Sequence, residues 1–200
     1  MVDIGNNLKK VSEILLDGGV VSFPTETVMG MGAVYDDYDA YVYLNILKGE
    51  RGNKPYTMML YSTEDIEEYA VVSEAARKVI NAFLPGPLTI LLKAKESVPS
   101  YVTHGTGVVG IRVPQHPICH EILKLVNKPL LVPSANPSNL PPATTVNEVS
   151  VYFGETLDYI VSNDSDKEQP STIVDLTSKN INILREGKIK KEEILKVLGE

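Results

Sequence analysis

Short apolar runs with the character of β-strands are the feature of this sequence that most restricts its fold. Eight such runs occur in the 200 residues, and segments with helical hydrophobic spacing lie between them without regular alternation. Strict alternation would favour a doubly wound parallel sheet, whereas this irregular order favours one α/β domain with a twisted mixed sheet flanked by helices. The strands are expected at 20–23, 56–61, 88–94, 108–113, 130–132, 159–161, 172–176 and 181–184.

Seven segments are expected to form helices because their apolar residues recur every three or four positions. Ser62 and Ser73 are suited to cap two of the helix starts, and Pro117 is suited to the first turn of another. Gly18 is placed to end the first helix. The helices are expected at 7–17, 39–48, 62–70, 73–84, 116–126, 146–153 and 190–198.

Charge and cysteine content narrow the classes of protein to which the chain can belong. The 19 basic and 26 acidic residues give a net charge of −7, and nucleic-acid affinity comes mostly from neutralising phosphates. A stand-alone nucleic-acid binder is therefore disfavoured, although a local basic groove remains open. Cys119 is the one cysteine, so no internal disulfide can form. The sequence shows no signal peptide and no membrane span, and we expect a cytoplasmic protein.

The segment VVSFPTETVMGMGA, residues 20–33, places three polar side chains directly after an apolar run. Thr25, Glu26 and Thr27 follow Pro24, and Glu26 carries the one charge of the segment. An ordinary surface loop would be more polar than this, and a strand edge needs no such cluster. The segment after the strand is therefore predicted to be a loop that holds a small ligand.

A cluster of cations follows the second expected helix. Lys48, Arg51 and Lys54 fall within seven residues, just before an expected strand. Clustered Lys and Arg match the charge and geometry of phosphate groups, so an anion site is one interpretation. The alternative is a solvated helix end, where cations are favourable beside the helix dipole.

Hydroxyl, amide and guanidinium groups occur at the ends of four other expected strands. Ser134 and Asn136 follow the run LLVP, where they could bind phosphate oxygens or a ribose, or else form an ordinary turn. Arg112 and Arg185 lie among apolar strand residues and need an anionic partner, and Ser171 adds a hydroxyl. Together these groups describe a cleft with several cations and no evident general base. Such a cleft suits a nucleoside triphosphate beside a small carboxylate substrate.

Two weaker patterns are set aside. Residues 105–110 fit G-x-G-x-x-G but lead into a strand rather than a helix, which argues against a dinucleotide site. His116, Cys119 and His120 have helical spacing, but zinc needs further ligands and no second cluster is present in the sequence. No metal site built from protein ligands is therefore expected.

Seven motifs occur in this order: PTETVMGMGA, KGERGNKP, LPGPLTILL, VGIRVPQHP, VPSANPSNLPPATT, PSTIVDL and ILREG. Together they closely resemble the YrdC/Sua5 family, the threonylcarbamoyl-AMP synthases. The resemblance extends from about residue 11 to residue 187, and it implies that residues 1–200 are a single catalytic domain of the short form with a concave, positively charged groove.

The resemblance also implies a reaction and its participants. L-threonine, bicarbonate or CO₂, and ATP with Mg²⁺ would give threonylcarbamoyl-AMP and pyrophosphate, and a Kae1/TsaD-type transferase would use the product for t6A modification at position 37 of tRNA. By motif match, L-threonine would be bound by Thr25, Arg112 and Ser171. The ATP phosphates would be bound by Lys48, Arg51 and Lys54, of which Lys48 and Arg51 would be catalytic, and the nucleotide by Ser134, Asn136 and Arg185.

The sequence departs from the family pattern at three places. The usual K-x-R is Lys48-Gly-Glu-Arg51, the tyrosine of ETVYG is Met29, and methionines 58 and 59 occupy a region that often holds a histidine. Two other functions stay open on sequence grounds. One is a carbamoyl-adenylate-forming domain of the hydrogenase-maturation type, which normally lies in a longer, cysteine-rich chain. The other is a module that binds tRNA or double-stranded RNA weakly in the groove.

Overall fold

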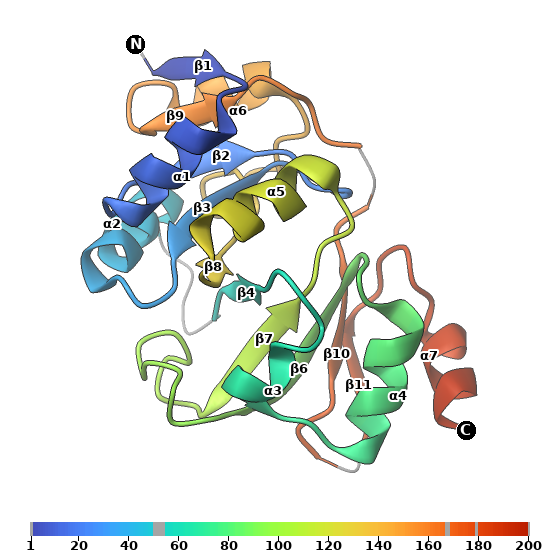
Figure 1. Ribbon diagram of the computed structural model, residues 1–200. Helices are drawn as coiled ribbons and strands as arrows, with labels where there is room; N and C mark the ends of the chain where they lie inside the picture. The colour runs from blue at the N-terminus through green and yellow to red at the C-terminus, as the bar shows by residue number, and fades with distance from the viewer. Residues whose placement is uncertain (1, 50–54, 167–168, 179, 200) are drawn as a thin grey trace.

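The sheet of this protein is mixed, as expected from the irregular order of its elements. The computed structural model describes residues 2–49, 55–166, 169–178 and 180–199. The strand order is β1-β9-β2-β3-β8-β4-β7-β6-β10-β11, and β5 pairs with β6 outside this path. Four pairs are parallel, β1 with β9, β9 with β2, β4 with β7 and β6 with β10, and the other pairs are antiparallel. The predicted fold class, a mixed α/β sheet flanked by helices, is confirmed (Figure 1).

The strands and helices have the following bounds. The strands are β1 (Asp3–Gly5), β2 (Val21–Phe23), β3 (Gly30–Val34), β4 (Thr57–Met59), β5 (Ala70–Val71), β6 (Leu88–Ala94), β7 (Val108–Arg112), β8 (Leu130–Leu131), β9 (Tyr159–Val161), β10 (Thr172–Asp175) and β11 (Asn182–Arg185). The helices are α1 (Leu8–Leu16), α2 (Tyr38–Lys48), α3 (Ile66–Tyr69), α4 (Glu74–Phe83), α5 (Pro117–Val126), α6 (Val146–Phe153) and α7 (Lys191–Leu198).

Two hydrophobic clusters pack the helices against the sheet. The smaller cluster joins α1 and α5 to the strands β2, β8 and β9 through side chains such as Leu15, Phe23 and Ile122. The larger cluster includes side chains of α2, α4 and α7 and of the central strands. In Figure 1, α1 and α5 lie side by side near β2 and β3, whereas α4 and α7 lie beside β10 and β11. No helix among the described residues is long and apolar enough to cross a lipid bilayer.

The helix ends follow the local signals of the sequence. Asn7 caps α1, Ser73 caps α4, and Thr145 forms a reciprocal capping box with Glu148 at α6. Pro117 occupies the first turn of α5. The expected helix at 62–70 is shorter in the structure, where α3 covers Ile66–Tyr69 and is followed directly by β5.

The loop predicted at residues 24–33 is shorter in the structure, and its role in holding a ligand stays a prediction. Residues 30–34 form the buried strand β3, which pairs antiparallel with β2, so the connection is residues 24–29. The glycines of β3 provide space rather than a turn. A Cβ on Gly30 would lie 2.6 Å from Val132 Cγ1, and one on Gly32 would lie 2.6 Å from Phe23 Cε1. Strands β1 and β5 were not anticipated, since each is only two or three residues long.

Candidate functional site

A cavity of about 480 Å³ lies over one face of the sheet. Four strand regions each contribute two residues that are two positions apart, and such residues point to the same face of a sheet. These pairs are Thr57 and Met59, Thr89 and Leu91, Gly110 and Arg112, and Ser171 and Ile173. The rest of the wall includes the β2–β3 connection at Thr27 and Val28, the segment 132–134 after β8, and Leu184 and Arg185 at the end of β11.

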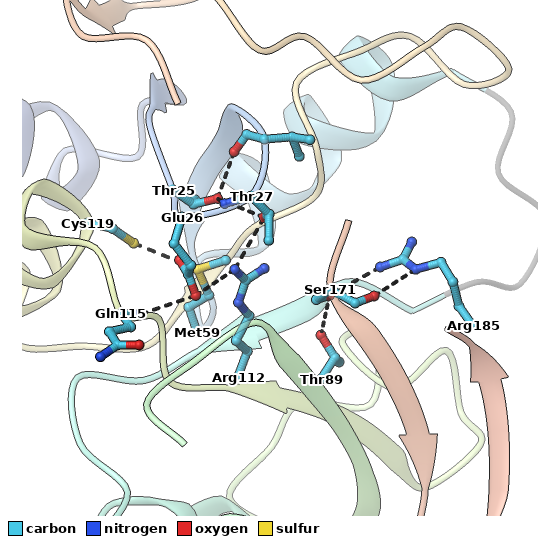
Figure 2. Close-up of polar contacts among 11 residues, drawn as sticks. Thr25, Glu26, Thr27, Met59, Thr89, Arg112, Gln115, Cys119, Ser171 and Arg185 are labelled. Atoms are coloured by element: carbon cyan, nitrogen blue, oxygen red, sulfur yellow. Dashed lines mark hydrogen bonds and ion pairs between the residues drawn. The ribbon is translucent and has the colours of Figure 1, made fainter. Parts of the chain in front are cut away.

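Arg112, at the end of β7, is a buried cation on the cavity wall. Its Nη2 lies 2.7 Å from Glu26 Oε1 and donates to Thr27 Oγ1 at 3.2 Å. Glu26 Oε1 also accepts the backbone N–H of Gln115 at 3.1 Å. Figure 2 shows the ion pair between Arg112 and Glu26. Arg112 is 5% exposed and Glu26 is 8% exposed, so both charges are largely desolvated. Within the described residues, Glu26 Oε2 and Arg112 Nε have no hydrogen-bond partner.

The hydroxyl cluster of the β2–β3 connection supports this arginine. Thr25 Oγ1 donates to the carbonyl of Val28 at 2.7 Å and accepts the N–H of Thr27 at 3.2 Å. The two threonine hydroxyls are 3.0 Å apart. Thr27 lines the cavity, whereas Thr25, which the sequence motif assigned to L-threonine, lies behind it. In this structure Thr25 therefore shapes the turn that presents Thr27 to Arg112.

Ser171 and Arg185 meet on the opposite wall. Arg185 donates from Nε to the carbonyl of Ser171 at 2.9 Å and from Nη2 to Ser171 Oγ at 3.1 Å. The same Oγ lies 3.1 Å from Thr89 Oγ1 of β6 (Figure 2). Thr89 is buried and was not identified from the sequence, where it is one residue of an apolar strand. Gly187 allows the chain after β11 to pass close to this corner, because a Cβ there would clash with the carbonyl oxygen of Pro170.

Lys48 reaches the same region from the end of α2. Its Nζ donates to the carbonyl of Ser134 at 2.8 Å, to Asn136 Oδ1 at 3.0 Å and to the carbonyl of Asn136. Ser134 lines the cavity, but Lys48 and Asn136 do not. The structure therefore brings Arg112, Ser134, Ser171 and Arg185 together on the cavity. Thr25, Lys48 and Asn136 do not line it but contact the lining residues Thr27 and Ser134. Arg51 and Lys54, which were predicted to meet phosphates, lie outside the described residues.

The methionines at the positions where the sequence departs from the family motifs lie in the core or on the cavity wall. Met29 and Met58 are fully buried in the core, whereas Met59 lines the cavity and its Sδ lies 3.8 Å from Cys119 Sγ. Burial raises the pKa of the Cys119 thiol. Met59 therefore forms part of the apolar floor, and Cys119 remains protonated below it.

Among the described residues that line the cavity, the charged ones are the cations Arg112 and Arg185. Partial burial, with the like charge of Arg112 as a smaller cause, lowers the pKa of Arg185, which nevertheless stays protonated at neutral pH. The described lining holds hydroxyls and guanidinium groups but no carboxylate, thiol or imidazole. No group of three His, Cys, Asp or Glu residues suited to a metal ion occurs in the described part of the chain. Such a wall can bind and orient anionic groups and stabilise charge that develops on them.

Comparisons with known proteins identify the family of the chain. The family model Sua5_yciO_yrdC, described as "Telomere recombination", matches residues 13–187. A Pyrococcus abyssi protein named threonylcarbamoyl-AMP synthase is 36% identical over 186 residues, which cover 92% of this chain and 55% of that protein. A Vibrio parahaemolyticus protein of the same name is 32% identical over 186 residues, covering 91% of this chain and 100% of that protein.

A solved structure resembles the whole chain. The crystal structure of P. abyssi Sua5 complexed with L-threonine superposes with a TM-score of 0.93 at 32% identity, and the match covers 100% of this chain and 61% of that one. The present chain thus spans a little over half the length of the P. abyssi relative and the full length of the Vibrio relative.

Proposed function

The chain belongs to the Sua5/YciO/YrdC family, as its seven motifs indicated, and we propose that it is an L-threonylcarbamoyladenylate synthase. The proposed reaction joins L-threonine, bicarbonate or CO₂, and ATP into threonylcarbamoyl-AMP and pyrophosphate. One observation carries the proposal: a single cavity presents two guanidinium groups, Arg112 and Arg185, among the hydroxyls of Thr27, Ser134 and Ser171. The two guanidinium groups match a small carboxylate substrate beside a phosphate group.

In this proposal Arg112 binds the carboxylate of L-threonine. One nitrogen of its guanidinium already contacts Glu26 and Thr27, so the substrate takes the remaining N–H groups. Because Glu26 and Thr27 already fix the guanidinium, little conformational entropy is lost when the carboxylate binds. Ser171 completes the amino-acid site across the cavity, and Thr25 contributes by shaping the turn that carries Thr27.

The nucleotide lies toward Ser134 and Arg185 in this proposal. Arg185 is a permanent cation that Ser171 already orients, so it can meet a phosphate without rearrangement. Mg²⁺ arrives with ATP as part of the substrate and neutralises the leaving pyrophosphate. The role of Arg51 and Lys54 as phosphate ligands stays a prediction from the motif.

Positioning and electrostatic stabilisation carry the chemistry. The amine of L-threonine takes up CO₂ to form a carbamate, and the carbamate oxygen attacks the α-phosphorus while pyrophosphate leaves. The described cavity lining contains no carboxylate or imidazole that could act as a general base. The rate enhancement is therefore attributed to alignment of carbamate and phosphate, and to cations beside the developing charge.

In this proposal a second enzyme uses the product. Threonylcarbamoyl-AMP is a mixed anhydride, so a second enzyme of the Kae1/TsaD type is proposed to transfer the group to tRNA for t6A modification. The net charge of −7 argues against strong RNA binding by this chain, because nucleic-acid affinity comes mostly from cations that neutralise phosphates. A cytoplasmic location, where ATP and tRNA are present, is part of the proposal.

The decisive test measures pyrophosphate release from MgATP and bicarbonate with and without L-threonine, together with the product mass. We expect release that requires L-threonine and a product with the mass of threonylcarbamoyl-AMP. Arg112→Ala should abolish it, whereas Arg77→Ala, which removes an exposed arginine of α4, should not change it. A carbamoyl adenylate formed from an added carbamoyl donor, without L-threonine, would favour the hydrogenase-maturation alternative. Salt-dependent RNA binding without any turnover would favour the RNA-binding alternative.

A further inference from the structure

Lys48 is engaged with a loop rather than directed into the cavity. It is the last residue of α2 and is 4% exposed. Among the described residues, its ammonium group donates to three acceptors: the carbonyls of Ser134 and Asn136 and the side-chain oxygen Asn136 Oδ1. In addition, the backbone carbonyl of Lys48 accepts the N–H of Ser138 at 2.7 Å. The end of α2 is thus fixed to the 134–138 segment through both side chain and backbone.

The side chain of Asn136 also forms hydrogen bonds within this loop. Its Nδ2 donates to the carbonyls of Pro137 at 2.9 Å and Leu140 at 2.7 Å. Its Oδ1 accepts from Lys48 and from Ser134 Oγ, the latter at 2.6 Å. These partners fix the orientation of the amide, because Nδ2 faces two carbonyls and Oδ1 faces two donors. The amide therefore has no remaining proton for a ligand.

The network determines the hydrogen-bonding character of Ser134. A serine hydroxyl has one proton, and Ser134 gives it to Asn136 Oδ1. Its oxygen lone pairs are left for the cavity, which Ser134 lines. An oxygen of this kind binds groups that donate a hydrogen bond. Phosphate oxygens of ATP are acceptors only, whereas the ribose hydroxyls and the adenine amino group are donors.

We infer that Lys48 is a positioning residue that fixes the 134–140 loop through Asn136, and that Ser134 thereby accepts a hydrogen bond from the nucleoside part of ATP. The inference rests on the proposed function, because it needs a nucleotide in the cavity. It differs from the motif-based prediction, in which Lys48 contacts the phosphates directly.

Nucleotides with different numbers of phosphates separate the two roles of Lys48. Calorimetric titration of ATP, AMP and adenosine would be compared for the wild type and Lys48→Met, with Lys124→Met of α5 as an exposed charge-loss control. A positioning role predicts that Lys48→Met weakens all three ligands by the same factor, about tenfold. A loss for ATP that is at least tenfold larger than the loss for adenosine would overturn the inference.

Asn136→Ala keeps the charge of Lys48 and tests the same network if Lys48→Met does not fold. We expect Asn136→Ala to weaken ATP, AMP and adenosine equally, and the double variant to bind no worse than the weaker single variant, because both changes remove one connection. Losses of the two variants that multiply in the double variant would contradict the inference.

The donor that meets Ser134 is found with analogues that each lack one donor. Ser134→Ala should weaken ATP about fivefold but leave unchanged the affinity for one of 2′-deoxy-ATP, 3′-deoxy-ATP and inosine triphosphate. The analogue that is insensitive identifies the group. Equal losses for all three analogues would refute the assignment of Ser134 as an acceptor. ATP binding that follows these patterns without threonylcarbamoyl-AMP formation would leave this inference intact and reject the proposed function.

Discussion

Replacing Glu26 with glutamine tests the buried ion pair that holds Arg112 on the cavity wall. Glu26→Gln removes the negative charge 2.7 Å from the guanidinium, and Arg112 is only 5% exposed. Removing one partner of a buried pair costs about 3–5 kcal/mol, because the other charge is left desolvated. Glutamine keeps an oxygen that can accept from Arg112 and from the N–H of Gln115, so we expect the lower value, about 3 kcal/mol.

The expected change is large enough to measure in two ways. For a chain of 200 residues, about 3 kcal/mol corresponds to a fall in Tm of roughly 6–12 °C. Urea unfolding followed by far-ultraviolet circular dichroism gives the free energy directly, and that signal suits a protein without tryptophan. The matched control is Glu67→Gln, which breaks an exposed pair with Arg77 and should change stability by no more than about 0.5 kcal/mol.

A double variant checks the physical reason. Glu26→Gln combined with Arg112→Met leaves neither charge buried, so it should be more stable than Glu26→Gln alone. If Glu26→Gln costs no more than the control, or if the double variant shows the simple sum of two losses, the ion pair does not stabilise the cavity wall as argued.

Three further outcomes follow from the site. Thr27→Val removes the hydroxyl that accepts from Arg112 and should raise KM for L-threonine about fivefold with little change in kcat, as measured by pyrophosphate release; an unchanged KM would place the substrate elsewhere. Because burial raises the pKa of Cys119, a thiol reagent at pH 8 should label the native protein only at the rate of unfolding, and fast labelling would contradict this. Burial lowers the pKa of His116 below its ordinary 6.5, so the unfolded chain binds more protons below that pH and stability falls there. Between pH 7.5 and 5.5 the free energy of unfolding should fall more for the wild type than for His116→Gln. A larger fall in the variant would show that the pKa of His116 is not lowered by folding.

Local signals predicted most elements of the fold because the helices carry their own caps. Residues 146–153 and 88–94 have the expected bounds in the structure, the first with its capping box and the second as a long apolar run. Strand β3 was missed because glycine weakens strand propensity, and the reason for glycine there is contact with Val132 and Phe23. Those contacts exist only after the sheet has formed, so a single sequence does not reveal them.

The sequence predicted which residues gather at the candidate site but not which of them line the cavity and which support the lining. Motifs identified Arg112, Ser134, Ser171 and Arg185, and the structure places all four on one cavity. Thr89 gave no signal, because a threonine inside an apolar strand is an ordinary residue and its role here comes from its contact with Ser171, the residue before β10. Glu26 was noticed without a role, since its partner is distant in the sequence.

The residues that line the cavity come from nearly the whole length of the polypeptide, so most of the chain must be synthesised before the cavity can form. Thr27 lies on one wall and Arg185 on the other, and β9 must enter between β1 and β2 before that edge of the sheet is complete. At about 5–20 residues per second, roughly 8 to 30 seconds separate the synthesis of these two residues. A nascent chain therefore has no binding site to offer until its last strand emerges from the ribosome. Substrate can stabilise the finished protein, but it cannot guide the early steps of folding.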